Sequence, residues 1–361
     1  MTAVAPSPVL VTMPASTGSV QLRIIDPIEC PEWDALIATH PHCTFFHSRA
    51  WAQTLAGTYG FNCQYVVAER NGRLHGLLPI IETRSWIRGI RAISLPFTDE
   101  CPALTSAEVN LESLLDAAAG DAETRRWTHL GMSVEPEILG ASAATHYTHQ
   151  LPLGIETDDL FDGCDSATRR AVRKAERSGV SVRFANDFDA VRDYYRLHCR
   201  TRARLGSPPQ PFRFFAGICQ HILQQGRGFV ALAIHRGRVI AGAVFFEFAG
   251  MAVYKFSASD ERFQELRASN LVIWRAIEKL VTSGARELNF GRTSLANGGL
   301  RRFKLGWGAQ EQAICRGQYC FETRSFEPVA DLAHGFHTRL IAALPPFVSR
   351  WIGTLAYPHL S

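Results

Sequence analysis

The sequence contains no long apolar run, and none of its stretches reaches the roughly 20 apolar residues that a membrane-spanning helix needs. Residues 1–20 also lack the basic start and the continuous apolar core of a signal peptide. They are rich in Ala, Pro, Ser and Thr, a composition that favours disorder. The sequence therefore predicts a cytoplasmic protein whose first 20 residues are disordered.

Cysteine pairs are missing as well. The nine cysteines are scattered along 361 residues without a Cys-x-x-Cys pair, which indicates reduced, mostly buried thiols rather than disulfides. Residues 40–47 combine three histidines with Cys43, but their spacing fits no standard zinc motif. No Gly-x-Ser-x-Gly motif occurs, so a serine hydrolase is not indicated. We expect no metal centre and no tightly bound cofactor.

The chain has little excess charge. A formal net charge of +4 over 361 residues allows a local basic groove but does not by itself indicate a nucleic-acid-binding protein. Hydrophobic residues make up 46% of the sequence and charged residues 20%, as in a globular enzyme. The length is greater than one core usually needs, so we expect two domains.

Two stretches share the pattern Ala-x-x-x-Gly-Arg at an offset of 165 residues, starting at Ala68 and Ala233. Apolar, β-rich runs flank both copies, and Asn71-Gly72 in the first copy is a strong signal for a tight hairpin. Helical patterns precede each hairpin, and a strand and a helix follow it. The chain is therefore predicted to contain a duplicated α/β unit.

Hydrophobic periodicity and terminating Gly or Pro residues locate the other elements. We expect helices at residues 30–41, 47–60, 107–119, 165–179 and 269–284. We expect strands at residues 90–97, 126–134, 251–260, 285–294 and 313–321. The order of helix, helix, antiparallel meander, helix and strand resembles that of a GNAT acyltransferase.

The segment GARELNFGRTSLANGGLRRFKLGWGAQ, residues 284–310, carries a more specific resemblance. It resembles the signature of FemAB-related GNAT proteins, in which a strand ending in Asn-Phe-Gly or Asp-Phe-Gly precedes a Phe-Lys-x-x-Trp-Gly segment. FFHSRAWAQTL, LHGLLPI and ISLPFTDE resemble matching stretches of that family's first domain. The likeness covers about residues 22–357 and is nearest to the FemAB-like group linked to exopolysaccharide and exosortase (PEP-CTERM) loci.

This resemblance implies an α/β (α+β) fold of tandem GNAT domains, each with a mixed, mostly antiparallel sheet flanked by helices. We expect a first domain at residues 21–153, a second domain with the active site at 154–325 and a C-terminal helical segment at 326–361. The implied activity is the transfer of an acyl or aminoacyl group from acyl-CoA or aminoacyl-tRNA to an amine of an envelope or exopolysaccharide precursor. A non-catalytic scaffold in polysaccharide assembly is the alternative.

The resemblance also implies the catalytic residues, because the Phe-Lys pair of the family helps to position donor and acceptor. They are Lys304, Phe303, Arg292 and Asn289. Lys304 could bind the oxyanion that forms during acyl transfer, or clamp a phosphate. Phe303 and Trp307 could line a donor channel, or both could belong to the core while Lys304 extends to solvent. Tyr254 and Lys255 complete the expected substrate-binding set.

A strongly basic helix at residues 165–179 is the second candidate site. Its cations recur at helical spacing, with Glu176 as the one acidic residue among them. They are Arg169, Arg170, Arg173, Lys174 and Arg177. The helix could hold a polyanion such as tRNA, a lipid diphosphate or the phosphates of CoA, or it could be a solvated surface.

The loop before the helix at 269–284 departs from the usual acyl-CoA motif. A typical GNAT loop is glycine-rich, and its backbone N–H groups hold the pyrophosphate at a helix N-terminus. Here QELRASN has no glycine, which weakens CoA as the donor without excluding it. No general base stands out among Asp260, Glu261, Glu247 and His198, so catalysis could depend on positioning of the amine.

The C-terminal stretch at residues 339–360 is apolar, and Pro345-Pro346 splits it into two short helices at most. It could lie on the inner membrane, with Trp351 and Tyr357 at headgroup depth, or pack on the body of the protein. The oligomeric state cannot be read from the sequence.

Overall fold

The computed structural model describes residues 19–85, 89–140, 144–328, 351–354 and 356–357. The expected disorder at the N-terminus and most of the expected C-terminal helical segment lie outside these residues. The chain forms two compact units. The first comprises residues 1–143 and 315–329, and the second comprises residues 144–314 and 330–360. The second unit therefore begins about ten residues before the expected boundary, and residues 315–325 return to the first.

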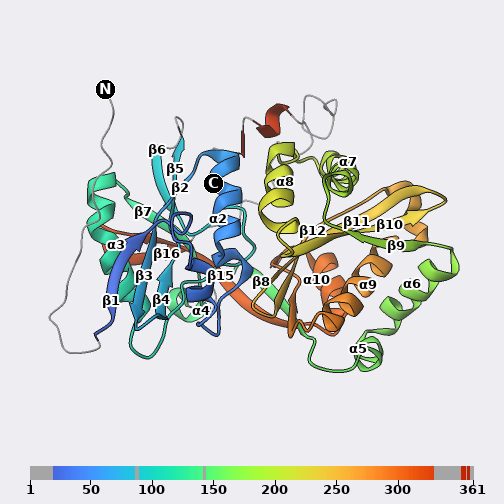
Figure 1. The fold of residues 1–361 in the computed structure, drawn as a ribbon, viewed down its shortest axis with the longest axis horizontal. Helices are drawn as coiled ribbons and strands as arrows, with labels where there is room; N and C mark the ends of the chain where they lie inside the picture. Colours follow the sequence, from blue (N-terminus) through green and yellow to red (C-terminus); the bar gives the residue numbers. More distant parts are fainter. Residues whose placement is uncertain (1–18, 86–88, 141–143, 329–350, 355, 358–361) are drawn as a thin grey trace. The chain divides into compact units, whose positions relative to one another are not determined.

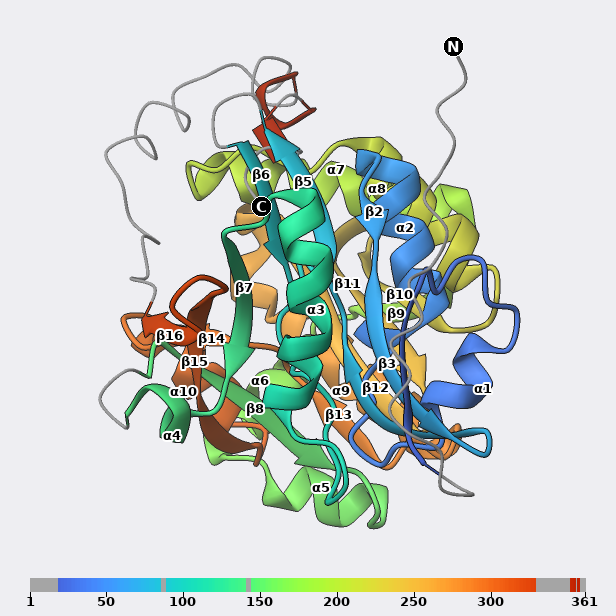
Figure 2. The ribbon, with the colours of Figure 1, turned by 90° about the vertical axis from the view of Figure 1, so that its left-hand side faces the viewer.

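The first unit contains two sheets (Figure 1). Strands β1 (Gln21–Ile25), β3 (Tyr65–Arg70) and β4 (Arg73–Leu78) form an antiparallel sheet in the order β1–β3–β4. The other sheet follows the order β2 (Asn62–Cys63), β5 (Ile81–Ser85), β6 (Gly89–Ile93), β7 (His129–Val134), residues 315–320 of β15 and β16 (Ser325–Pro328). Its helices are α1 (Trp33–Ile37), η1 (Phe45–His47), α2 (Arg49–Tyr59), α3 (Leu111–Arg125) and α4 (Pro136–Leu139). Helix α3, which runs along the front of Figure 2, packs on the β1–β3–β4 sheet.

The second unit is built on one mixed sheet. Its order is β9 (Ser181–Ala185), β10 (Gly228–His235), β11 (Arg238–Phe248), β12 (Met251–Ser259), β13 (Glu287–Asn289), β8 (His146–Pro152) and residues 310–314 of β15 (Gln310–Cys320). The short strand β14 (Thr293–Ser294) pairs with β8. Every pairing is antiparallel except that of β12 with β13.

Helices cover both faces of this sheet. They are α5 (Thr157–Gly163), α6 (Ser166–Arg177), α7 (Phe188–Arg204), α8 (Phe212–Ile218), η3 (Cys219–Leu223), η4 (Glu261–Leu266), α9 (Ala268–Thr282) and α10 (Gly298–Leu305). In Figure 1, α7 and α8 lie on one side of β10–β12, while α9 and α6 lie on the other. Between α9 and the sheet, a core forms from alternate strand residues and one face of α9, including Phe245, Leu271 and Leu288.

The predicted duplication is confirmed by local geometry as well as by element order. In the β3–β4 hairpin, Asn71 and Gly72 both have positive φ angles of 53° and 72°; in the β10–β11 hairpin, Arg236 and Gly237 have 48° and 73°. Each hairpin also has a register shift directly after its matching alanine, Ala68 or Ala233. Two successive positive φ angles give the tight turn that follows the twist of the strands.

His47 illustrates how a conserved-looking motif can serve structure. Its ring is completely buried; Nδ1 accepts the Thr44 N–H at 3.0 Å, and Nε2 lies 3.1 Å from the Pro102 carbonyl oxygen. Burial lowers the pKa of His47 to about 4, so the ring is neutral at pH 7. The His47 side chain thus caps the short helix η1.

The nine cysteines are free thiols, and eight of them are buried.

The described C-terminal residues pack on the second unit. The Tyr357 hydroxyl donates to the Pro208 carbonyl at 3.1 Å, and Tyr357 is buried, whereas Trp351 is 66% exposed. Tyr357 therefore packs on the body of the protein, which is one of the two alternatives for this stretch. No helix in the described part of the chain is long and apolar enough to cross a membrane.

Replacing Gly72 with Ala should destabilise the first unit by about 1–2 kcal/mol, because a side chain at a left-handed turn position is strained. Gly120→Ala is the matched control: Gly120 is exposed within α3, and a Cβ there would touch nothing within 4 Å. It should stabilise the helix by about 0.5–1 kcal/mol. Urea unfolding measures both changes, and equal effects of the two substitutions would contradict the turn geometry.

Candidate functional site

The sheet of the second unit opens between its two parallel strands. β12 and β13 pair only through Met251–Val253 and Glu287–Asn289, although β12 continues to Ser259. β13 ends at Asn289, so the later residues of β12 have no partner from it. An edge of this kind presents N–H and C=O groups that can pair with an extended ligand. All of the expected catalytic residues lie on or near the end of β13.

The turn after β13 is fixed by side chains from two directions. The Asn289 Oδ1 accepts the Gly291 N–H at 2.6 Å, and its Nδ2 lies 3.4 Å from the Thr148 Oγ1. Gly291 has a φ of 72°, which favours glycine. From α10, the Lys304 ammonium donates to the carbonyl oxygens of Gly291 at 2.7 Å and of Arg292 at 3.0 Å.

Lys304 is 3% exposed, so it does not extend to solvent. Two of its donors hold the backbone of the turn, and the structure thus gives the lysine a definite contact that sequence reasoning did not foresee. Phe303 packs partly buried against the core and meets Trp307 edge to face at 6.2 Å. Trp307 is 1% exposed and belongs to the core cluster, which matches the alternative in which it does not line a channel.

The residues after α10 dock on the start of the basic helix. The Asp165 N–H donates to the Gly306 carbonyl at 2.9 Å, and the Cys164 thiol lies 3.9 Å from the Trp307 carbonyl oxygen. The Asp165 side chain also caps α6 by accepting the Thr168 N–H. The two candidate sites from the sequence are thus neighbours in the fold.

The basic helix α6 divides its cations between two roles. Arg169 turns back to the carbonyl oxygens of Asp162 and Cys164, so it stabilises the chain before the helix. Arg173 lies over the Phe161 ring at 5.3 Å. The exposed cations of α6 are Arg170, Arg173, Lys174 and Arg177. Four exposed cations remain available to an anionic partner.

Tyr254 and Lys255 lie on β12 where its edge is open. Tyr254 contacts Phe245 and Phe290, and burial raises its pKa to about 12, so its hydroxyl stays protonated at neutral pH. Lys255 is the extra residue of a β-bulge, because Tyr254 pairs with Phe245 and Phe256 with Val244. A bulge bends the strand and increases its twist, which helps β12 to turn away from β13.

A charge cluster between α10 and β15 was not expected from the sequence. Arg301 makes a bidentate contact with Glu311 at 2.8 and 2.5 Å and lies over the Tyr147 ring at 4.3 Å. The hydrogen bond from Arg301 lowers the pKa of Glu311. Arg301, although its side chain is 40% exposed, is thus held by an ion pair and a ring contact.

His149 lies in the same cluster. It is completely buried, and its Nε2 lies 3.6 Å from the Glu311 Oε2, yet neither ring nitrogen makes a well-formed hydrogen bond with any described residue. Burial lowers the pKa of His149, and the charge of Lys304 lowers it further. A buried, neutral imidazole beside Lys304 is a signal that only the folded structure provides.

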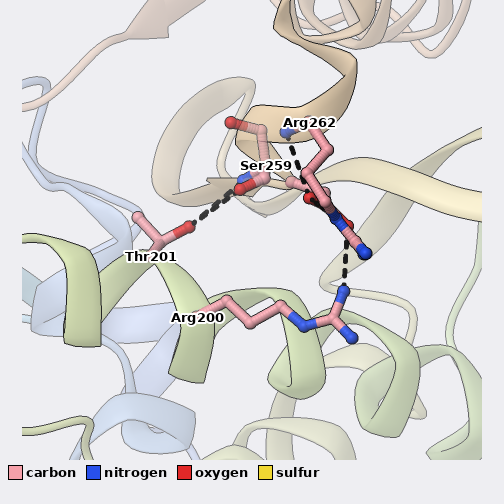
Figure 3. A network of polar contacts seen from close by, with 5 residues as sticks. Arg200, Thr201, Ser259 and Arg262 are labelled. Atoms are coloured by element: carbon pink, nitrogen blue, oxygen red, sulfur yellow. Dashed lines mark hydrogen bonds and ion pairs between the residues drawn. The ribbon is translucent and has the colours of Figure 1, made fainter.

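A cavity of about 250 Å³ lies at the end of β12. Its lining residues are Arg200, Arg204, Ser259, Asp260, Glu261 and Arg262. Asp260 is 5% exposed and accepts hydrogen bonds from Arg262 at 2.9 and 2.5 Å and from Arg200 at 2.9 Å (Figure 3). These bonds, chiefly those from Arg262, lower the pKa of Asp260. The carboxylate holds two guanidinium groups beside the cavity.

The end of the same loop starts α9. Arg267 adopts a left-handed conformation, with φ 57° and ψ 28°, at the N-cap of α9. The loop reaches this glycine-like conformation although it contains no glycine. The helix therefore begins with an arginine at its N-cap, and a helix N-terminus favours negative charge.

The four candidate bases differ in their surroundings. Asp260 is ion-paired as described, and Glu261 lies 3.8 Å from Arg204. The Glu247 carboxylate accepts from the Ser283 hydroxyl at 3.1 Å. Burial lowers the pKa of His198 to about 3. A histidine of that pKa is a weak base at pH 7.

The sequence and the fold are both similar to those of known proteins. Residues 164–311 match the family model described as "Acetyltransferase (GNAT) domain". The fold of the whole chain is that of a tandem pair of GNAT domains, as predicted. No curated protein is similar enough in sequence to count as a match.

Three solved structures carry the comparison. The crystal structure of FemX has a TM-score of 0.65 at 16% identity, over 78% of this chain and 93% of that chain. A conserved protein of unknown function from Bacteroides thetaiotaomicron has a TM-score of 0.54 at 10% identity, over 80% and 97%. A tandem GNAT protein from the clavulanic acid biosynthesis pathway has a TM-score of 0.50 at 13% identity, over 86% of this chain and 100% of that chain. At these identities the likeness shows the fold alone.

Replacing Lys304 with Met should destabilise the protein by about 2–4 kcal/mol, because two buried carbonyl groups lose a charged donor. Lys174→Met, at an exposed position of α6, should change stability by less than about 0.5 kcal/mol. Urea unfolding monitored by circular dichroism compares the two variants. Equal stability of the two would mean that Lys304 does not hold the turn.

Asp260→Asn should destabilise the protein by about 1–2 kcal/mol at pH 7, after allowance for the exposure of the two arginines. The pKa of Asp260 is lower in the folded than in the unfolded protein. The carboxylate therefore stabilises the fold fully above the ordinary carboxyl pKa, and this stabilisation is lost as the pH falls through the pKa of the folded state. The difference from wild type should shrink below about pH 4. Asp193→Asn, in an exposed pair with Arg196, is the control and should show little effect at any pH.

Proposed function

We propose that this protein is an N-acyltransferase that moves an activated acyl group from an acyl-CoA donor to an amine. The observation that carries the proposal is the opening between β12 and β13, directly followed by an arginine-rich loop and the N-terminus of α9. The GNAT match over residues 164–311 supports the reaction class.

The open edge of β12 suits the arm of such a donor. From Tyr254 to Ser259 the strand has no partner in β13, so its backbone groups can pair with the amide groups of an extended arm. The phosphates of the donor would lie by the loop between Asp260 and Arg267. There the guanidinium groups held by Asp260 and the N–H groups at the start of α9 favour negative charge.

The acceptor is proposed to be an amine on an envelope or exopolysaccharide precursor, in line with the likeness to FemAB-like proteins and to the PEP-CTERM-linked group in particular. Catalysis in this proposal depends on holding a neutral amine against the acyl carbonyl, since Asp260 is ion-paired and His198 has a lowered pKa. A cytoplasmic location with peripheral contact to the inner membrane belongs to the same proposal.

Two other functions have an observation in their favour. The four exposed cations of α6 favour a tRNA-linked donor, in which case binding would weaken steeply with salt. The absence of a glycine-rich donor loop favours a binding protein without catalysis. Titration with acetyl-CoA and with aminoacyl-tRNA separates the three: binding of neither would favour the scaffold.

Calorimetric titration with acetyl-CoA should detect binding, and Arg200→Gln combined with Arg262→Gln should weaken it by at least about 10-fold, because charge-assisted contacts to phosphate are lost. The control is Arg192→Gln, because Arg192 lies on α7 like Arg200 but pairs with the exposed Asp189. Mass spectrometry of a panel of amines then identifies the acylated product. Equal affinities of the double variant and the control would exclude the arginine loop as the phosphate site.

A further inference from the structure

In the peptide unit that joins Gly291 to Arg292, the carbonyl group is hydrogen-bonded to a described residue and the N–H group is not. Its carbonyl accepts from the Lys304 ammonium at 2.7 Å. In a trans peptide the N–H points away from the carbonyl of the same unit, so the Arg292 N–H faces away from Lys304. That N–H makes no hydrogen bond to any described residue.

The rest of the turn leaves this N–H little freedom to move. The preceding N–H, of Gly291, is bound to the Asn289 side chain, and the following carbonyl, of Arg292, is bound to Lys304. The hydroxyl of Thr293, which is 1% exposed, also lacks a partner among the described residues. A turn fixed by an ammonium, an amide and a left-handed glycine is over-determined, as turns at functional sites often are.

We propose that the backbone N–H of Arg292 is the donor that binds the developing oxyanion, and that Lys304 is a positioning residue that acts through the Gly291–Arg292 peptide. This inference rests on the proposed acyltransferase function. A cation on the carbonyl polarises the peptide and strengthens its N–H as a donor. The fixed orientation means that no reorganisation is needed when charge develops.

The chemistry balances without a further reactant. The amine nitrogen attacks the thioester carbonyl carbon; the C–N bond forms and the π electrons move to oxygen, which the Arg292 N–H binds. When the oxyanion collapses, the C–S bond breaks and the thiolate leaves with the electron pair. The proton lost by the amine ends on the thiolate, which gives an amide and a free thiol. Lys304 transfers no proton and does not touch the substrate.

A double-mutant cycle on steady-state kinetics tests this assignment. Arg292→Pro removes the N–H, whereas Arg292→Ala keeps it and serves as the reference. Relative to R292A, R292P should lower kcat by about 10²–10³-fold with the KM for acetyl-CoA changed less than about threefold. K304M should lower kcat by a similar factor, and R292P/K304M should lose no more than either single variant.

Two outcomes would overturn the proposal. Equal kcat values for R292P and R292A would exclude the N–H, and losses that multiply in the double variant would show that Lys304 acts independently. If R292P does not fold, an ester bond at position 292, made by incorporating lactic acid, removes the N–H with little change in shape and makes the same comparison with R292A. A wild-type protein that acylates no amine would instead refute the proposed function.

Discussion

The second unit is organised around one buried ammonium group. Lys304 reaches from α10 to two carbonyl groups of the turn after β13, and in a low-dielectric interior such charge-assisted hydrogen bonds are strong and directional. They fix where β13 stops, how the chain turns toward β14 and how α10 sits on β8. The turn after β13, which lies beside the opening of the sheet, is therefore held in place by Lys304.

The sequence predicts much of this architecture because local signals agree with the fold. The duplicated hairpins, the helix at 165–179 and the strand at 251–260 appear within a few residues of their expected positions. The helix α10 is not among the predicted elements, since GGLRRFKL begins with two glycines and has no clear apolar stripe. Its stability comes from packing and from the Asn297 cap, and tertiary contacts of this kind override weak propensity.

The candidate site could be located from the sequence but not oriented. The Asn-Phe-Gly and Phe-Lys elements lie together in the fold, yet the contact between Lys304 and Gly291 depends on a helix crossing that no pattern encodes. The same holds for the contact of Arg301 with Glu311 and for His149, which carries no sequence motif at all. Arg169 likewise turns inward while its neighbours on α6 remain exposed.

The donor loop shows why a missing glycine is weak grounds for a missing function. Glycine is favoured in such loops because it adopts positive φ without strain, but Arg267 adopts φ 57° at the N-cap of α9. A non-glycine residue in that region is uncommon, and strain of this kind persists where the surrounding structure enforces it. Here the enforced geometry places an arginine at the N-cap of α9, where the helix terminus favours anions. The loop thus reaches a positive φ without glycine, so the missing glycine does not by itself argue against the donor site proposed above.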